Sequence, residues 1–150
     1  MTLKEFLNQG RLAHHKTSSG EISDLLNIVE RDLKDAQVKG ISSDRRFTIA
    51  YNAVLQLATL ILYCKEYKPK GVGHHFVTLQ SIKEILGKEY HPLIEYFDSC
   101  RVKRSISEYD RAREISESEV EELIEEASKF KEMVKEWVKK NFPTLLMKLP

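Results

Sequence analysis

The segment FTIAYNAVLQLATLILY, residues 47–63, decides the fold. Its apolar residues fall on almost every side of a helix, and a helix that is apolar all round is a buried, central one. Asp44, or Ser43 beside it, is suited to cap the start of this helix, and YKPKGVG, residues 67–73, ends it. The core positions that we expect on this helix are Tyr51, Val54, Leu57, Ala58 and Ile61.

The flanking segments also show helical periodicity, whereas alternating strand patterns are nearly absent. The other predicted helices are a short one over about 3–13, a second after the break at 17–20 that Gly40 closes, one over about 74–86 that stops at Gly87, a fifth beginning near Pro92, and a last one with a Ser116–Glu119 capping box. The connections are short, which favours antiparallel neighbours. The sequence therefore predicts an all-α, up-and-down helical bundle of four to five main helices in one domain, residues 1–150.

Composition places this chain among ordinary soluble proteins, with 24 basic and 23 acidic residues and a net charge of +1. Any affinity for nucleic acid must therefore come from local clustering of charge. Cys64 and Cys100 are expected to be reduced, packed thiols. The N-terminus lacks the apolar core of a signal peptide, and the run AVLQLATLILYC is too short and interrupted for a membrane span. We expect a cytoplasmic protein without a membrane partner.

Motifs of common enzymes are absent: the sequence has no Gly-x-Ser-x-Gly, no phosphate-binding glycine loop and no His-Glu-x-x-His. The adjacent pairs His14/His15 and His74/His75 would point their rings about 100° apart on a helix, so neither pair chelates a metal from one face. The sequence predicts neither a metal site nor a cofactor.

Positive charge is concentrated in the segment RVKRSISEYDRAR, residues 101–113. Its cations are Arg101, Lys103, Arg104, Arg111 and Arg113, against two carboxylates. A solvated helix face with exposed ion pairs is one interpretation. The surplus of cations favours the other, a surface that binds an anion, to which Lys68, Lys70 and His74 in the preceding loop can contribute. On a continuous helix one face would hold Arg101, Arg104, Glu108, Arg111 and Ile115, and in the solvated-face interpretation Arg104 pairs with Glu108.

The order of AYNAVLQLATLILY (50–63), HHFVTLQSIKEIL (74–86) and RVKRSISEYDRAR ahead of an acidic amphipathic helix resembles the HEPN superfamily. That superfamily comprises small helical bundles linked to RNA cleavage or binding, often beside nucleotidyltransferases and in toxin–antitoxin systems. The resemblance covers about 42–141, and the helices over about 3–36 are less characteristic. It implies a homodimer in which the Arg104 segments of two chains meet.

The superfamily's ribonucleases carry an arginine followed, after four to six residues, by a histidine. Arg104 matches the arginine, but Tyr109 stands five positions on, and no histidine follows at a permitted spacing. With an unperturbed pKa of about 10, tyrosine is a poor base for a ribose 2′-hydroxyl. Arg104 and Tyr109 are nevertheless the catalytic candidates.

Three hypotheses remain open. The first is a non-catalytic HEPN-like domain that binds RNA or a nucleotide through the Arg104 segment. The second is a divergent ribonuclease. The third is a protein-interaction bundle that holds a partner such as an antitoxin or a nucleotidyltransferase.

Overall fold

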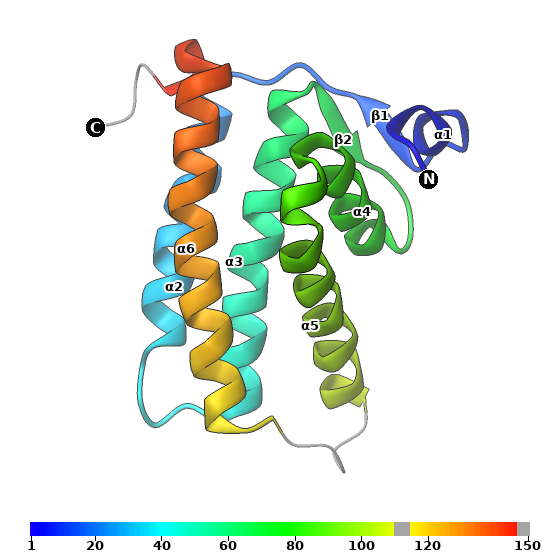
Figure 1. Ribbon diagram of the computed structural model, residues 1–150. Coiled ribbons are helices and arrows are strands. Elements are labelled where there is room, and N and C mark those ends of the chain that lie inside the picture. Colours follow the sequence, from blue (N-terminus) through cyan, green and yellow to red (C-terminus); the bar gives the residue numbers. More distant parts are fainter. Residues whose placement is uncertain (110–114, 147–150) are drawn as a thin grey trace.

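The computed structural model describes residues 1–109 and 115–146, with side chains over 1–105 and 115–146. Helices dominate the described ranges (Figure 1). The elements are α1 (Leu3–Asn8), β1 (Leu12–His14), α2 (Ser19–Ala36), α3 (Ser43–Cys64), β2 (Tyr67–Pro69), α4 (His74–Leu86), α5 (His91–Tyr109) and α6 (Glu117–Asn141), with 3-10 turns at Lys88–Tyr90 and Pro143–Leu146. The predicted all-α bundle is confirmed.

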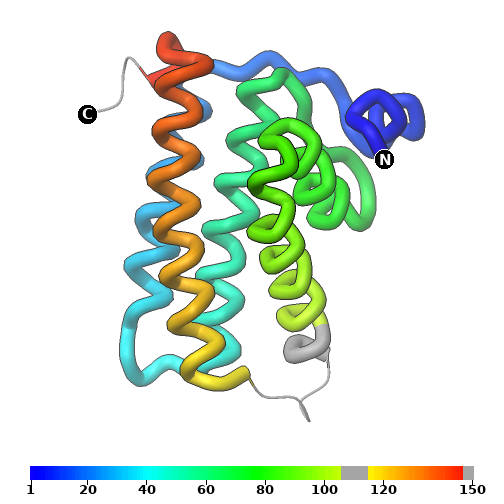
Figure 2. The backbone as a smooth tube through the Cα atoms, in the orientation of Figure 1, coloured from blue at the N-terminus to red at the C-terminus, as the bar shows by residue number. Residues whose placement is uncertain are grey.

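Helix α3 is the central element, and it packs against α2, α4, α5 and α6. The colour gradient shows that α2 and α5 run opposite to α3, whereas α6 runs in the same direction (Figure 1). The short α4 lies on the side of α3 away from α6 (Figure 2). All five core positions expected on α3 are buried, with exposed fractions of 1% or less. The apolar circumference of α3 follows from its having neighbours on every side.

Capping explains where several helices begin. Ser116 and Glu119 form the predicted reciprocal capping box at the start of α6, and Ser18 caps α2. The predicted cap of α3 is wrong: Ser42 is the N-cap residue, and it makes no side-chain cap bond. Ser43 instead donates to the carboxylate of Glu117, so its hydroxyl links α3 to α6.

The N-terminal segment differs from the prediction, because the expected helix over 3–13 ends at Asn8. Gly10, at φ +71°, turns the chain, and β1 then pairs antiparallel with β2, with Ala13 opposite Lys68. Strands of three residues are too short to show an alternating pattern, which is why the sequence did not indicate them. Helix α2 likewise ends at Ala36, before Gly40.

The length of α3 corrects a second expectation. Its 22 residues are long and apolar enough, by length and composition, to cross a membrane, whereas the run read from the sequence was judged too short. Within the described residues α3 is the one helix of this kind, and most of its apolar window is buried inside the bundle, as in the core helix of a soluble protein. Both cysteines are buried free thiols, as expected.

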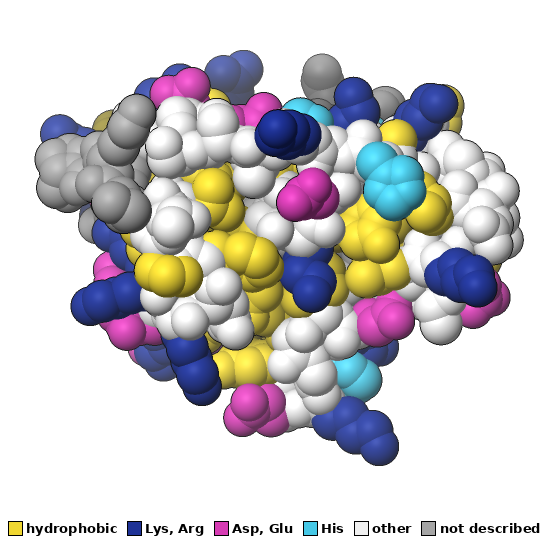
Figure 3. All heavy atoms as spheres, turned by 90° about the horizontal axis from the view of Figure 1, so that it is seen from above, with side chains coloured by type: hydrophobic (Ala, Val, Ile, Leu, Met, Phe, Trp, Pro, Cys, Tyr) yellow, Lys and Arg dark blue, Asp and Glu magenta, His cyan; other side chains and the backbone are white. Residues whose placement is uncertain are grey.

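The end of the bundle next to the small sheet is of mixed character. Figure 3 looks down on this end and shows hydrophobic side chains at the surface, with acidic and basic side chains interspersed around them. Trp137 and Phe142, whose rings lie 5.4 Å apart, are partly buried near the C-terminus of α6. Charges of both signs alternate here, so this end presents no basic surface on the face shown.

Candidate functional site

Two adjoining hollows lie on the side of the bundle formed by α3, α4 and α5. We call the first the cationic hollow; it has a volume of about 290 Å³ and is lined by Gly73, His74, His75, Phe76, Arg101, Arg104 and Ser105. We call the second the carboxylate hollow; it has a volume of about 250 Å³ and is lined by Asp32, Thr48, Ile49, Tyr51, Asn52, His75 and Arg104. They share His75 and Arg104 and therefore adjoin, and we call the two hollows together the groove.

Local structure accounts for the positions of the basic residues. Gly73 adopts φ +75° at the N-cap of α4, a left-handed conformation that glycine tolerates, and the helix then begins at His74. The rings of His74 and His75 lie 4.7 Å apart and nearly perpendicular. Arg101 and Arg104 are three residues apart on α5, so they face the same way. The first turn of α4 therefore lies next to the part of α5 that carries Arg101 and Arg104.

Tyr51, His75 and Arg104 meet at the junction of the two hollows. The Tyr51 hydroxyl lies 3.3 Å from His75 Nδ1, and the Arg104 guanidinium lies 5.5 Å from the centre of the Tyr51 ring. Burial raises the pKa of Tyr51, so its hydroxyl stays protonated and is available as a donor. The cation over the aromatic face is a favourable contact in its own right.

His75 is the neutral member of this cluster. Burial lowers its pKa to about 4, and the cationic neighbours His74, Arg104 and Arg101 contribute in the same direction. At neutral pH the imidazole therefore carries no charge. With Nδ1 accepting from Tyr51, Nε2 carries the proton, and His75 then offers an N–H to a ligand.

Arg101 contributes charge next to an exposed ring. Its Nε donates to Asp98 at 2.8 Å, and its guanidinium lies 5.4 Å from the centre of the Phe76 ring. The two terminal nitrogens make no hydrogen bond to a described residue, so they remain available to an anion. Phe76 is 37% exposed and His74 is also exposed. An aromatic ring at the rim of a cationic hollow is suited to stacking.

Asp32 and Asn52 form a polar pair in the carboxylate hollow. Asn52 Nδ2 donates to Asp32 Oδ2 at 2.6 Å, and Arg31 Nη2 donates to Oδ1 at 3.2 Å. Asp32 is only 5% exposed, whereas the side chain of Arg31 is largely in solvent. A carboxylate with so little exposure is costly unless it is hydrogen-bonded, and these two contacts compensate it.

The structure brings together three of the predicted anion-binding residues, Arg101, Arg104 and His74. Lys103 does not join them, because it pairs with Glu119 on α6, and its ammonium holds the pKa of that carboxyl at about 2. Lys68 and Lys70 are exposed but line neither hollow.

The remaining predicted residues are only partly covered. Arg111 and Arg113 lie outside the described residues, as does the side chain of Tyr109. Ile115 does not lie on a helical face with the arginines, because it is outside a helix and buried just before the Ser116 cap of α6.

Five residues of the groove were missed by sequence reasoning: Asp32, Tyr51, Asn52, His75 and Phe76. For Asp32 and Asn52 the sequence does contain a signal of an unusual position. Asn52 is an amide within a helix that is otherwise apolar on nearly all sides, and Asp32 lies three residues from Val29 on the apolar stripe of α2. His75 left none, because its proximity to Arg104 depends on how α4 packs beside α5.

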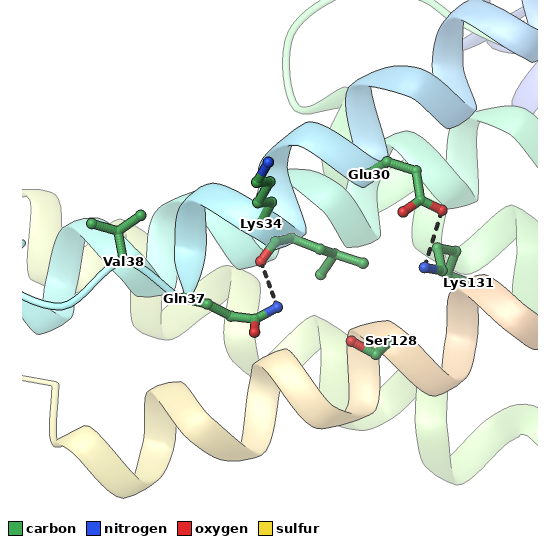
Figure 4. Close-up of a pocket in the computed structure, with 7 residues that line it drawn as sticks. Glu30, Lys34, Gln37, Val38, Ser128 and Lys131 are labelled. Carbon is green, nitrogen blue, oxygen red and sulfur yellow. Dashed lines mark hydrogen bonds and ion pairs between the residues drawn. The ribbon is translucent and has the colours of Figure 1, made fainter.

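A third hollow, of about 330 Å³, lies between α2 and α6 and is less suited to a ligand. Figure 4 shows Glu30 and Lys131 pointing at one another across it; their ion pair measures 3.0 Å. Lys135 also approaches Glu30, and Gln37 donates to the carbonyl of Leu33. These charges are satisfied across the helix interface, so this hollow has a structural explanation.

No protein-family model matches the chain, and neither a curated protein nor a solved structure matches it at a significant level. Among the residues that the structure describes, no group of three or more His, Cys, Asp or Glu side chains is placed to hold a metal ion. The chemistry of the groove is therefore that of its arginines, imidazoles, aromatic rings and the Asp32–Asn52 pair.

Proposed function

We propose that this protein is a HEPN-like helical domain that binds RNA or a nucleotide in the groove formed by the cationic and carboxylate hollows. Arg104 is the central ligand, because a planar guanidinium can donate two hydrogen bonds to one phosphate. Arg101 supplies a second charge, and His75 a neutral N–H.

The observation that carries the proposal is the junction of the two hollows at Arg104 and His75. On one side of it lie cations beside the exposed Phe76 ring, a combination that suits a phosphate next to a stacked base. The solvated-face interpretation explains this less well, since the terminal nitrogens of Arg101 have no partner among the described residues.

Binding of a fluorescent single-stranded RNA, measured by anisotropy at low and at moderate salt, tests the proposal. We expect binding that weakens steeply as salt rises, because the cations displace counterions from the phosphates. Arg104→Ala should weaken binding roughly ten- to hundredfold, the loss of a hydrogen-bonded charge.

Lys129→Ala is the matched control, because it removes one positive charge from an exposed position on α6 that lines neither hollow. It should leave binding nearly unchanged. Equal losses in the two variants would show that only net charge matters. Absence of RNA and nucleotide binding by the parent protein would refute the proposal and favour the protein-interaction hypothesis, with an antitoxin or a nucleotidyltransferase as the partner.

The proximity of an imidazole to Arg104 favours one second function, cleavage of RNA. In the tautomer with Nδ1–H donating to Tyr51, His75 Nε2 accepts a proton from a ribose 2′-hydroxyl, whose oxygen then attacks the adjacent phosphorus. The bond from phosphorus to the 5′-oxygen of the next nucleotide breaks, that oxygen takes a proton from water, and a 2′,3′-cyclic phosphate remains. The low pKa keeps the imidazole in its basic form at neutral pH, but it also makes it a weak base. Binding is therefore the primary proposal.

Cleavage has its own test. Single-stranded RNA is incubated with the parent protein, with His75→Gln and with Tyr109→Phe, beside a substrate with 2′-deoxyribose throughout. Cleavage of the RNA alone that disappears in His75→Gln would establish the second function and assign its base. Loss in Tyr109→Phe instead would assign that role to the tyrosine.

The proposed assembly is a homodimer in which two Arg104 segments approach each other, as the resemblance to the superfamily implies. Light scattering at micromolar concentration measures the mass directly against the 17.4 kDa chain. A monomer at every concentration tested would remove any composite site between two copies.

A further inference from the structure

We propose that the carboxylate hollow holds the base of the bound nucleotide and selects guanine through Asp32 and Asn52. This inference rests on the proposed function and names the ligand preference of the same groove. It starts from the difference between the two hollows, which share His75 and Arg104 but are otherwise lined by different chemistry.

Charge orients the nucleotide. Among the residues whose side chains are described, the cationic hollow is lined by two arginines and two imidazoles and by no carboxylate. The carboxylate hollow contains Asp32, whose negative charge repels a phosphate at short range. The phosphate is therefore expected between Arg101 and Arg104, and the base on the far side of Arg104, where Ile49 and Tyr51 supply apolar wall.

The Asp32–Asn52 pair presents acceptors of fixed orientation. A carboxylate only accepts hydrogen bonds, so the amide nitrogen of Asn52 must be the atom facing Asp32 Oδ2. The amide oxygen Oδ1 is then the free end of the side chain, and it has no partner among the described residues. Oδ1 of Asn52 and the remaining lone pairs of Asp32 together form an acceptor-rich patch.

Guanine matches such a patch best among the four common bases. Its Watson–Crick edge places two donors side by side, the N1–H and the N2 amino group. Because Asp32 Oδ1 already accepts twice from Arg31, these two donors are matched by the remaining lone pair of Asp32 Oδ2 and by Asn52 Oδ1. Adenine presents one amino donor next to the acceptor N1, which would face the carboxylate unfavourably. Uracil offers one donor, N3–H, between two acceptors, and cytosine offers one amino donor next to the acceptor N3. A bidentate contact of this kind corresponds to a preference of about tenfold over the other bases.

The test measures binding of the 5′-monophosphates of guanosine, adenosine, cytidine and uridine to the parent protein by calorimetry. The guanine nucleotide should bind about tenfold more tightly than the other three. Inosine 5′-monophosphate, which lacks only the N2 amino group, should lose most of this advantage. This comparison needs no variant, so it is independent of any effect of substitution on folding.

Asp32→Asn should remove the preference for guanine while nucleotides still bind, because the phosphate contacts are unchanged. Asp35→Asn, an exposed carboxylate on the same helix, is the matched control and should retain the preference. Equal binding of all four nucleotides, or inosine binding as well as guanosine, would overturn the base assignment and leave the proposed function standing. Absence of binding by any nucleotide and by RNA would overturn both.

Discussion

Arg46 and Arg104 occupy contrasting regions of the same molecule. Arg46 is 2% exposed where α2, α3 and α6 meet, and all three of its nitrogens donate within the chain. Nε donates to the carbonyl of Ala36 at 2.7 Å, Nη1 to Glu117 at 2.8 Å and Nη2 to Glu121 at 2.9 Å. Arg104 lies at the junction of two hollows, next to a tyrosine ring and close enough to His75 to lower the pKa of that imidazole.

Under the proposed function, this difference distinguishes a structural arginine, Arg46, from a ligand-binding one, Arg104. Around Arg46 two carboxylates balance one guanidinium. The hydrogen bond from Ser43, together with Arg46, lowers the pKa of Glu117, and the hydrogen bond from Arg46 lowers the pKa of Glu121. Around Arg104 the described groups of the cationic hollow are Arg101, His74 and the neutral His75.

The largest expected effect on stability comes from a substitution in α3, which carries Arg46 and contributes Tyr51 to the groove. Leu57→Asp places an unpaired carboxylate at a fully buried position of α3, at a cost of about 5 kcal/mol or more, which approaches the whole stability of a small domain. The variant should fail to fold, as judged by far-ultraviolet circular dichroism. A soluble variant with full helicity would show that α3 is not the common core of the two regions.

Arg46→Met should have the next largest effect on stability, because it removes three charged hydrogen bonds and leaves the Ala36 carbonyl without its donor. We expect a loss of about 2 kcal/mol in the free energy of unfolding, measured with urea. Arg45→Met, at the exposed neighbouring position, is the control and should change stability little. Equal effects at the two positions would contradict a structural role for Arg46.

His75 should make the stability of the groove region depend on pH. Its pKa is about 4 in the folded protein against 6.5 ordinarily, so between these values the unfolded chain binds a proton that the folded chain does not. Stability should therefore fall as pH drops from 6.5 towards 4, by an amount on the order of 1 kcal/mol once solvent screening is counted.

Urea unfolding of the parent and of His75→Gln at pH 7 and pH 5 measures this difference. The variant should lose less stability between the two pH values than the parent does. The carboxylates with lowered pKa values are the same in both proteins, so the comparison of the two proteins isolates the contribution of His75. Identical pH dependence in both proteins would exclude a neutral, buried His75.

Arg104→Met should have the smallest effect on stability, under about 1 kcal/mol, because Arg104 is partly exposed and interactions of exposed cations, including its cation–π contact with Tyr51, stabilise a fold weakly. It conserves the length of the side chain while removing the charge that the groove provides. Compared with Arg46→Met, this variant should lose binding and keep its urea midpoint. A loss of stability as large as that of Arg46→Met would place Arg104 among the structural arginines.

The fold could be predicted because its main signals are local. The apolar circumference of residues 47–63, the Ser116–Glu119 capping box and the stop at Gly87 each act over a few residues, and each was confirmed. The small sheet was missed because its strands have three residues each and are joined only by pairing between distant segments.

The groove could be predicted only in part, for the same physical reason. Arg101 and Arg104 stand on one helix, and their three-residue spacing already places them together. His75 and Asp32 come from two other helices, and their positions depend on how α4 and α2 pack around α3. Lys103 shows the converse: it lies between the two arginines in sequence, yet it turns to Glu119 on α6.

The small sheet also constrains the order in which the molecule assembles. Pairing of β1 with β2 brings together two segments that are separated in the chain by the whole of α2 and α3. Bringing two such distant segments together costs chain entropy. The hydrogen bonds between two strands of three residues cannot offset this cost until α2 and α3 have already packed against each other. The N-terminal segment should therefore dock late in folding and open first, and its amides should exchange with solvent hydrogens well before those of α3.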